Sequence, residues 1–392
     1  MKVFQYLLTF AVIAGVLLWL RPHFELEQPF IAYAVGGAFL LFLASKPQKL
    51  ELMAVAVVGL AFAIVITHRA LLPRMLSSIA AGFGMASVAS MASSALWVFP
   101  RTRRETMLGL APAATMIFFV GSSVHSLLAG FFREHTFDLY AYVFDSSFGS
   151  EISFRAGQLI HGKPWPTFAV VITYESVVVA IAAFYAAFMN RRDRPIWELV
   201  ELLFGASFLG YVFYTFFPAT GPGYVFPGFP LDALPLDQIQ HLKPVSIPIT
   251  MHFPRNAVPS LHLTWTLLIW WNCRSLAKWA QVAAGLFVLG TAFSAMAIGE
   301  HYLFDLIVAL PFALLVQSIM IRTVKITNRS RWLPAIFGFV IFALWLLIGR
   351  FGLPILFVSK WLPWALTIVS SIACVVWAFR LPALIPEMQE GR

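Results

Sequence analysis

Long apolar segments constrain this chain more than any other feature of its sequence. Segments of about 17–25 mostly apolar residues, the length an α-helix needs to cross a bilayer, recur along the chain. Only 11% of its 392 residues are charged, against about 25% in a typical soluble domain. A transmembrane β-barrel would instead show short segments of alternating polarity. The sequence therefore predicts an all-α integral membrane protein.

Twelve segments are predicted to be transmembrane helices. They lie at about 4–20, 30–45, 51–67, 76–99, 107–131, 168–189, 197–217, 257–273, 279–299, 302–321, 332–349 and 362–379. The first segment is long for a signal peptide, and no small-residue cleavage site follows it. We therefore expect it to remain as a transmembrane helix.

Lysine and arginine set the predicted orientation, because they collect in the cytoplasmic loops of membrane proteins. A cytoplasmic N-terminus places the densest clusters inside, namely Arg101–Arg104, Arg191–Arg194 and Arg322–Arg331. Both termini are then cytoplasmic. These loops account for the net charge of +9, so we expect membrane lipids and no nucleic acid as partners.

Three regions follow from the predicted segments. Residues 1–106 form an accessory four-helix region, in which small residues between Ser77 and Ser94 permit close helix contact. Residues 107–321 form a catalytic six-helix core with outer loops 132–167 and 218–256. Residues 322–392 supply two C-terminal helices and a short cytoplasmic tail.

The two outer loops differ in pattern. In loop 132–167, aromatic residues at Phe137, Tyr140, Phe144 and Phe148 recur every three or four positions. This spacing predicts an amphipathic helix whose apolar face anchors it in the membrane interface. Loop 218–256 is rich in proline, so it is expected to be irregular and to cover the outer mouth of the bundle.

Two histidine motifs carry the candidate chemistry, and both lie on the predicted non-cytoplasmic side. Asn256-Ala257-Val258-Pro259-Ser260-Leu261-His262 precedes one apolar segment, and Gly299-Glu300-His301-Tyr302-Leu303-Phe304-Asp305 precedes another. His301 and Asp305 are four residues apart, so on a helix they share one face and can touch.

These residue types suit phosphoryl transfer. A neutral imidazole can attack phosphorus while a carboxylate on its other nitrogen fixes the tautomer, and a second, protonated histidine can donate to the leaving oxygen. Ser260 can cap the helix that follows it, and the N–H groups at that helix start favour a phosphate. Arg255 is the nearest upstream cation.

The motifs resemble those of the type 2 phosphatidic acid phosphatase superfamily, and more closely the branch that contains fungal inositol phosphorylceramide synthase. The matching pieces are Val258-Pro259-Ser260-Leu261-His262 and His301-Tyr302-Leu303-Phe304-Asp305-Leu306-Ile307, with weaker matches at 138–149 and 213–218. The resemblance covers roughly 107–321. It implies a phosphohistidine on His301, with Asp305 as its orienting partner and His262 as the general acid.

Departures from the phosphatase branch bear on what binds the phosphate. That branch has glycine at the position of Leu261, and Ser-Arg where this chain has Ser294-Ala295. Its early Lys…Arg-Pro motif is not recognisable either. Arg255, Ser260 and Lys243 are therefore the candidates for phosphate binding, and the departures favour the transferase-like branch.

The predicted function is transfer of a phosphoryl-linked head group from a lipid phosphoester donor to a lipid acceptor. With water as acceptor, the chain would be a lipid phosphate or polyprenyl diphosphate phosphatase; a lipid transporter is a third alternative. No cofactor and no metal are expected, since Cys273 and Cys374 lie in or beside apolar segments and no CxxC occurs. Compact loops favour a bacterial cytoplasmic membrane with the site facing the periplasm or exterior; a Golgi-type membrane is the alternative.

Overall fold

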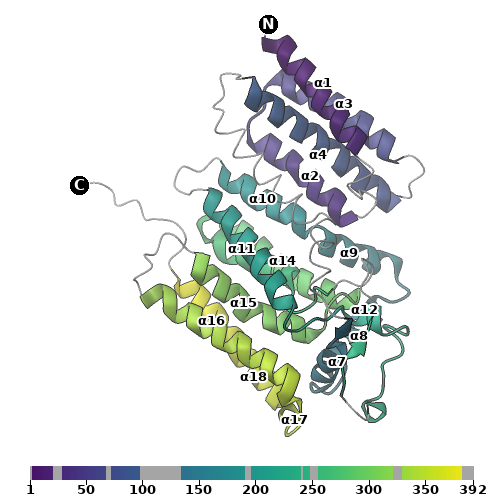
Figure 1. Ribbon diagram of the computed structural model, residues 1–392, viewed down its shortest axis with the longest axis vertical. Coiled ribbons are helices and arrows are strands. Elements are labelled where there is room, and N and C mark those ends of the chain that lie inside the picture. Colours follow the sequence, from purple (N-terminus) through teal and green to yellow (C-terminus); the bar gives the residue numbers. More distant parts are fainter. Residues whose placement is uncertain are drawn as a thin grey trace. The chain divides into compact units, whose positions relative to one another are not determined.

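The computed structural model describes residues 2–20, 29–67, 72–97, 134–189, 196–239, 242–247, 255–320 and 329–381. In these ranges the chain is almost wholly helical (Figure 1), as the apolar segments predict. It forms two compact units, one of residues 1–124 with 175–200 and one of residues 125–174 with 201–392. The predicted segment 107–131 lies outside the described residues.

The first unit is a bundle of closely packed helices. It contains α1 (Lys2–Leu20), α2 (Pro29–Ala44), α3 (Lys49–Thr67), α4 (Leu72–Leu96) and α10 (Val177–Met189). Glycines allow α4 to approach its neighbours: a side chain at Gly84 would overlap the backbone of Val35, and one at Gly82 would overlap Gly59. The predicted close contact through small residues is therefore confirmed.

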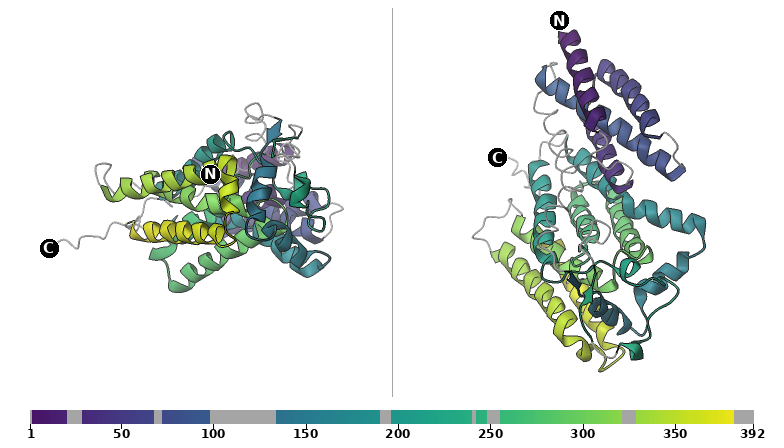
Figure 2. Two further views of the ribbon diagram at one scale, coloured as in Figure 1. Left: turned by 90° about the horizontal axis from the view of Figure 1, so that it is seen from below. Right: turned by 45° about the vertical axis from the view of Figure 1, so that its right-hand side comes forward.

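The second unit holds the remaining described elements (Figure 2). Its longer helices are α7 (Asp138–Ser146), α8 (Ile152–Ile160), α9 (Pro164–Glu175, with Glu175 counted in the first unit), most of α11 (Ile196–Tyr214), α13 (Leu261–Asn272), α14 (Lys278–Ala297), α15 (Leu303–Met320), α16 (Arg329–Leu347) and α18 (Leu362–Arg380). Short elements are α12 (Pro222–Val225), α17 (Leu353–Leu356), 3-10 turns at Leu236–Gln238 and Cys273–Ser275, and a π-helical turn at Ile348–Gly352.

Helix α15 is the centre of the second unit. It packs against α13, α16 and α18, and 78% of its residues are buried. At the far end from its first turn, Gln317 forms a reciprocal amide pair with Asn272 of α13, with Nδ2 of Asn272 2.8 Å from Oε1 of Gln317. A buried polar pair of this kind fixes which turns of the two helices face each other.

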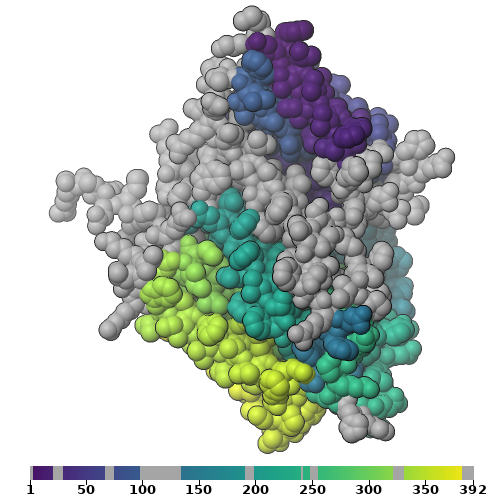
Figure 3. All heavy atoms as spheres, viewed as in Figure 1, coloured from purple at the N-terminus to yellow at the C-terminus, as the bar shows by residue number. Residues whose placement is uncertain are grey.

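The exposed faces of α16 and α18 in the second unit are largely apolar, as expected for helices that face lipid. Helices α16 and α18 form part of the surface seen in Figure 3, and their exposed side chains include Phe339, Val369 and Ile372. Among the described residues, seven helices are long and apolar enough to cross a membrane, or eight if α9 and α10 form one bent span. This fits an all-α membrane protein; the count of twelve and the six-helix core remain predictions.

The predicted helix in loop 132–167 exists as α7, but its predicted membrane anchoring is wrong. Tyr140, Phe144 and Phe148 are all buried, and Phe144 packs on Phe304 of α15 and Trp345 of α16. The aromatic spacing reflected packing against protein rather than lipid. Loop 218–256 is mostly irregular where it is described, as predicted, and its short strand β2 (Val245–Ser246) pairs antiparallel with β1 (His135–Thr136).

The compact units place α10 with the first four helices, through its packing on α2. The predicted catalytic core, in contrast, includes this segment. Packing alone does not define where a catalytic region begins, so the three-region division of the chain remains a prediction.

Candidate active site

His301 and Asp305 meet as their spacing predicts. Nδ1 of His301 lies 3.2 Å from Oδ2 of Asp305, and both side chains are buried. The expectation that both residues lie on one helix is wrong in one detail. Helix α15 begins at Leu303, so His301 lies in the segment that enters it. Asp305 occupies the first turn and reaches back to accept the N–H of Tyr302 at 2.8 Å.

The start of α15 is capped by carboxylates from two elements. A first-turn side chain that accepts the N–H preceding the helix forms half of a capping box, and Asp305 does this. The next two N–H groups, of Leu303 and Phe304, donate to the carboxylate of Asp145 on α7 at 3.0 and 3.1 Å. Helix α7 therefore fixes the position of the turn that carries His301.

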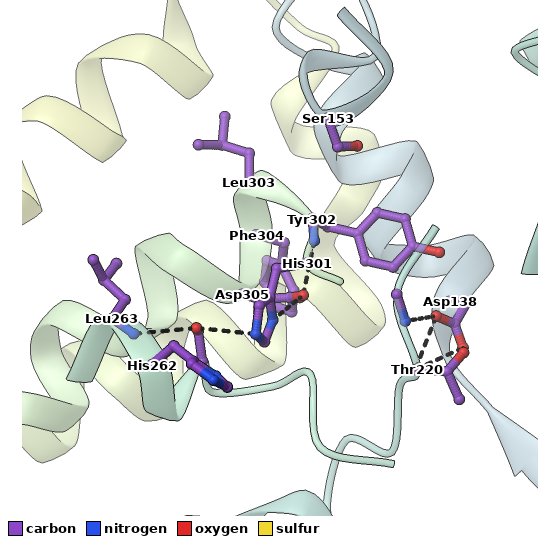
Figure 4. A network of polar contacts seen from close by, with 12 residues as sticks. Asp138, Ser153, Thr220, His262, Leu263, His301, Tyr302, Leu303, Phe304 and Asp305 are labelled. Atoms are coloured by element: carbon purple, nitrogen blue, oxygen red, sulfur yellow. Dashed lines mark hydrogen bonds and ion pairs between the residues drawn. The ribbon is translucent and has the colours of Figure 1, made fainter. Parts of the chain in front are cut away.

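A second carboxylate of α7 holds the start of loop 218–256. Oδ1 of Asp138 accepts the N–H groups of Thr220 and Gly221 at 3.1 and 3.0 Å (Figure 4). Burial raises the pKa of Asp138, although these two N–H groups favour its charged form. Burial likewise raises the pKa of Asp145, to about 7. The two aspartates thus tie α7 to both segments that border the histidines.

Glycines let loop 218–256 lie against the turn before His301. Gly221 and Gly299 both have positive φ, and the N–H of Gly223 donates to the carbonyl of Gly299 at 2.9 Å. A side chain at Gly221 would overlap the carbonyl of Glu300. The Tyr224 hydroxyl also donates to Glu300 at 2.7 Å. Burial raises the pKa of Glu300, and this hydrogen bond opposes the shift.

Ser260 joins the two histidine motifs. Its Oγ accepts the N–H of Leu263 at 3.4 Å and caps α13, as predicted. The same Oγ lies 3.2 Å from Nε2 of His301, and the N–H of Ser260 donates to the carbonyl of Asp305 at 3.3 Å. The sequence indicated the capping role, but the contact with His301 depends on how α13 and α15 pack.

These contacts assign the tautomer of His301. Asp305 Oδ2 already accepts the N–H of Tyr302, so it acts as an acceptor toward His301 Nδ1 as well. The neutral imidazole then carries its proton on Nδ1, and Nε2 presents a lone pair. Ser260 Oγ is the hydroxyl that donates to that lone pair. Nε2 is therefore the nitrogen suited to attack an electrophile.

His262 faces His301 from the first turn of α13. The centroids of the two rings lie 6.2 Å apart (Figure 4). On its other side, His262 stacks on Tyr174 of α9 with a centroid distance of 4.1 Å, and the Tyr174 hydroxyl lies 3.1 Å from Nδ1. The sequence singled out His262 but gave no indication of Tyr174, which lies in the interior of a predicted transmembrane segment.

The predicted phosphate-binding cations lie in different surroundings. Arg255 is buried and donates to the carbonyl of Ile247; burial lowers its pKa, and the charge of Asp138 opposes this shift. Lys243 is exposed. Ala295 is fully buried, and its carbonyl accepts the N–H groups of Glu300 and His301. The phosphate-binding roles of Arg255, Ser260 and Lys243 remain predictions.

Residues 140–319 match the model of one protein family, the PAP2 superfamily. The match begins in α7 and ends in α15, so it contains both histidine motifs, Tyr174 and Asp145. No curated protein and no solved structure matches the chain. The match supports a lipid phosphatase or phosphotransferase in general terms, whereas the inositol phosphorylceramide synthase branch remains a prediction.

Proposed function

We propose that this protein is a membrane-embedded lipid phosphotransferase that works through a phosphohistidine on the non-cytoplasmic side of the membrane. One observation carries the proposal. An imidazole with its lone pair on Nε2 and a buried carboxylate on Nδ1 faces a second imidazole across 6.2 Å. Such a pair supplies a nucleophile and a proton donor on either side of a phosphorus atom.

The first step forms the phosphoenzyme. Nε2 of His301 attacks phosphorus, and the bond from phosphorus to the lipid oxygen breaks. His262 gives a proton to that oxygen, so the lipid leaves as an alcohol. The ring of His301 becomes positively charged, and the Asp305 carboxylate beside Nδ1 stabilises that charge. Ser260, which contacts Nε2 before substrate binds, lies beside the transferred group.

The second step regenerates the enzyme. The hydroxyl of an acceptor attacks phosphorus, its proton passes to His262, and the bond from phosphorus to Nε2 breaks. The electron pair of that bond returns to the imidazole, and His262 is again protonated for the next cycle. The same chemistry gives transfer with a lipid hydroxyl and hydrolysis with water.

The charge around His301 favours a phosphodiester donor over a phosphomonoester. Ala295 occupies the position where the resemblance places a phosphate-binding arginine, and the carboxyl group of Glu300 lies next to His301 in the chain. A phosphodiester carries one negative charge, whereas a phosphomonoester carries up to two and needs more positive charge around it. This supports head-group transfer as the main proposal and phosphomonoester hydrolysis as the alternative.

A transfer assay with the purified protein tests the proposal. The protein in detergent micelles is given ³²P-labelled phosphatidylinositol or phosphatidic acid, with ceramide, with diacylglycerol or with neither. We expect label on the lipid acceptor with phosphatidylinositol, and no transfer by His301→Ala. Free phosphate or free inositol phosphate in every condition would identify a hydrolase. Unchanged activity of His301→Ala would refute the mechanism, and lipid uptake by proteoliposomes without any turnover would identify a transporter.

A further inference from the structure

Tyr174 lies beside His262, and neither the sequence motifs nor the proposed steps include it. It is buried near the end of α9, where its ring stacks on His262 with an interplanar angle of 21°. Its hydroxyl lies 3.1 Å from Nδ1 of His262. Stacking fixes the plane of the imidazole, and the hydrogen bond fixes its rotation within that plane. The two contacts together orient the ring.

The two histidines therefore have different partners on Nδ1. His301 has the Asp305 carboxylate, which only accepts hydrogen bonds and favours a positively charged ring. His262 has a phenol, which can donate to a neutral ring or accept from a protonated one. A phenol therefore supports both protonation states of His262, where a carboxylate would hold the proton on the ring.

This difference matches the two tasks of the mechanism. The nucleophile must carry a positive charge while phosphorus is bound to it, and Asp305 stabilises that state. The acid must release a proton to the leaving oxygen and then take one from the acceptor. Because Tyr174 engages Nδ1, that exchange uses Nε2 of His262 in both directions, and rotation of one hydroxyl follows the change of state.

We propose that Tyr174 is a positioning residue that orients His262 as the proton donor to the leaving group. The inference rests on the proposed function. Its consequence is selective: losing the Tyr174 hydroxyl slows the reaction only where the leaving oxygen needs a proton. A purely structural tyrosine would affect all substrates alike.

Leaving-group dependence separates these two roles. Tyr174→Phe keeps the stacked ring and removes the hydroxyl. Its first-turnover rate is measured with phosphatidylinositol, whose diacylglycerol oxygen needs a proton, and with p-nitrophenyl inositol phosphate, whose p-nitrophenolate leaves without one. Phosphatidic acid and p-nitrophenyl phosphate form the matching pair for a phosphomonoester enzyme. Tyr142→Phe is the control, because the buried Tyr142 donates to the carbonyl of Leu234.

We expect Tyr174→Phe to lower the first-turnover rate on the lipid substrate by about tenfold or more. This loss is part of the roughly 10²–10⁴-fold acceleration that general acid catalysis supplies. The p-nitrophenyl ester should be cleaved at nearly the wild-type rate. Tyr142→Phe should change both substrates by the same factor. Equal losses of Tyr174→Phe on both substrates, or no loss on either, would overturn the inference while leaving the proposed function intact. If the wild type cleaves neither pair, the proposed function fails and this inference fails with it.

Discussion

At the level of single residues, the two histidines of the site differ in what holds them. His301 is fixed between the carboxylate of Asp305 and the hydroxyl of Ser260, both within 3.2 Å. His262 is fixed by the ring and hydroxyl of Tyr174. Each residue type is suited to one role, because a carboxylate stabilises a positively charged imidazole and a phenol serves either protonation state.

Replacing Asp305 by asparagine tests whether its negative charge supports His301. The amide oxygen of Asp305→Asn can take the place of Oδ2 toward Nδ1 of His301 and the N–H of Tyr302, but the charge that stabilises a positively charged His301 is lost. We expect kcat/KM to fall on the order of 10³–10⁴-fold, as when a buried aspartate behind a catalytic histidine becomes asparagine. Asp237→Asn, at an exposed aspartate of loop 218–256, should leave the rate unchanged. A loss below tenfold for Asp305→Asn would contradict this role.

Asp145 predicts a pH dependence of stability. Burial raises its pKa from 3.8 to about 7, so the folded protein binds this proton more tightly than the unfolded chain. That stabilisation is complete below about pH 4 and is lost as the pH rises to about 7. Asp145→Asn has no proton to lose at this position. The Tm of the wild type minus the Tm of Asp145→Asn should therefore fall between pH 5 and 7.5 and then stay constant. Thermal unfolding in detergent measures it, and a pH-independent difference would contradict the prediction.

The sequence alone identified the residues of the two histidine motifs, but not all the contacts between them. Four-residue spacing identified the His301–Asp305 pair, because that contact is local. Tyr174 could not be found in the same way, since it lies 88 residues before His262, in a predominantly apolar segment that carries no recognisable motif. The contact of Ser260 with His301 spans 41 residues and likewise depends on helix packing.

At the level of elements, α7 shows what apolar spacing does and does not indicate. The aromatic residues at intervals of three and four predicted the helix, but not that protein rather than lipid covers it. The two aspartates of α7 explain why protein covers this helix. Asp138 and Asp145 are seven residues apart, and each accepts two backbone N–H groups from another segment. Charged groups that serve as buried caps require α7 to lie within the protein.

The contact between loop 218–256 and the turn before His301 predicts that Gly221→Ala impairs catalysis. The new Cβ would overlap the carbonyl of Glu300, so either the loop or the histidine turn must move. We expect a lower Tm and a loss of kcat of about tenfold or more, since small displacements of catalytic groups are costly. Activity and thermal unfolding are measured on the same preparation.

Gly149→Ala is the matched control for this variant. Gly149 also has a positive φ, of 93° against 108° at Gly221, but a Cβ there would meet nothing within 4 Å. It should therefore show the cost of the backbone conformation alone, about 1–2 kcal/mol, with nearly unchanged kcat. Equal effects of the two variants on kcat would show that the close approach to Glu300 is unimportant.

At the level of the whole molecule, hydropathy predicted where helices lie better than how they group. Each predicted segment within the described ranges coincides with a helix or, at 168–189, with the pair α9 and α10. The division of that pair between two compact units was not predictable, because both halves are predominantly apolar and read as one continuous transmembrane segment. Spacing in sequence reports local periodicity, whereas grouping depends on which helix surfaces fit together.

The central claim is a covalent intermediate on His301, and trapping it is the most direct test. The protein is mixed with ³²P-labelled phosphatidylinositol or phosphatidic acid without a lipid acceptor, stopped with alkaline detergent after milliseconds to seconds, and the labelled peptide is mapped. We predict a label that survives alkali, is lost in acid, lies on His301 and is absent from His301→Ala. A wild-type enzyme that turns over without any such label, or a label that persists in His301→Ala, would contradict the account.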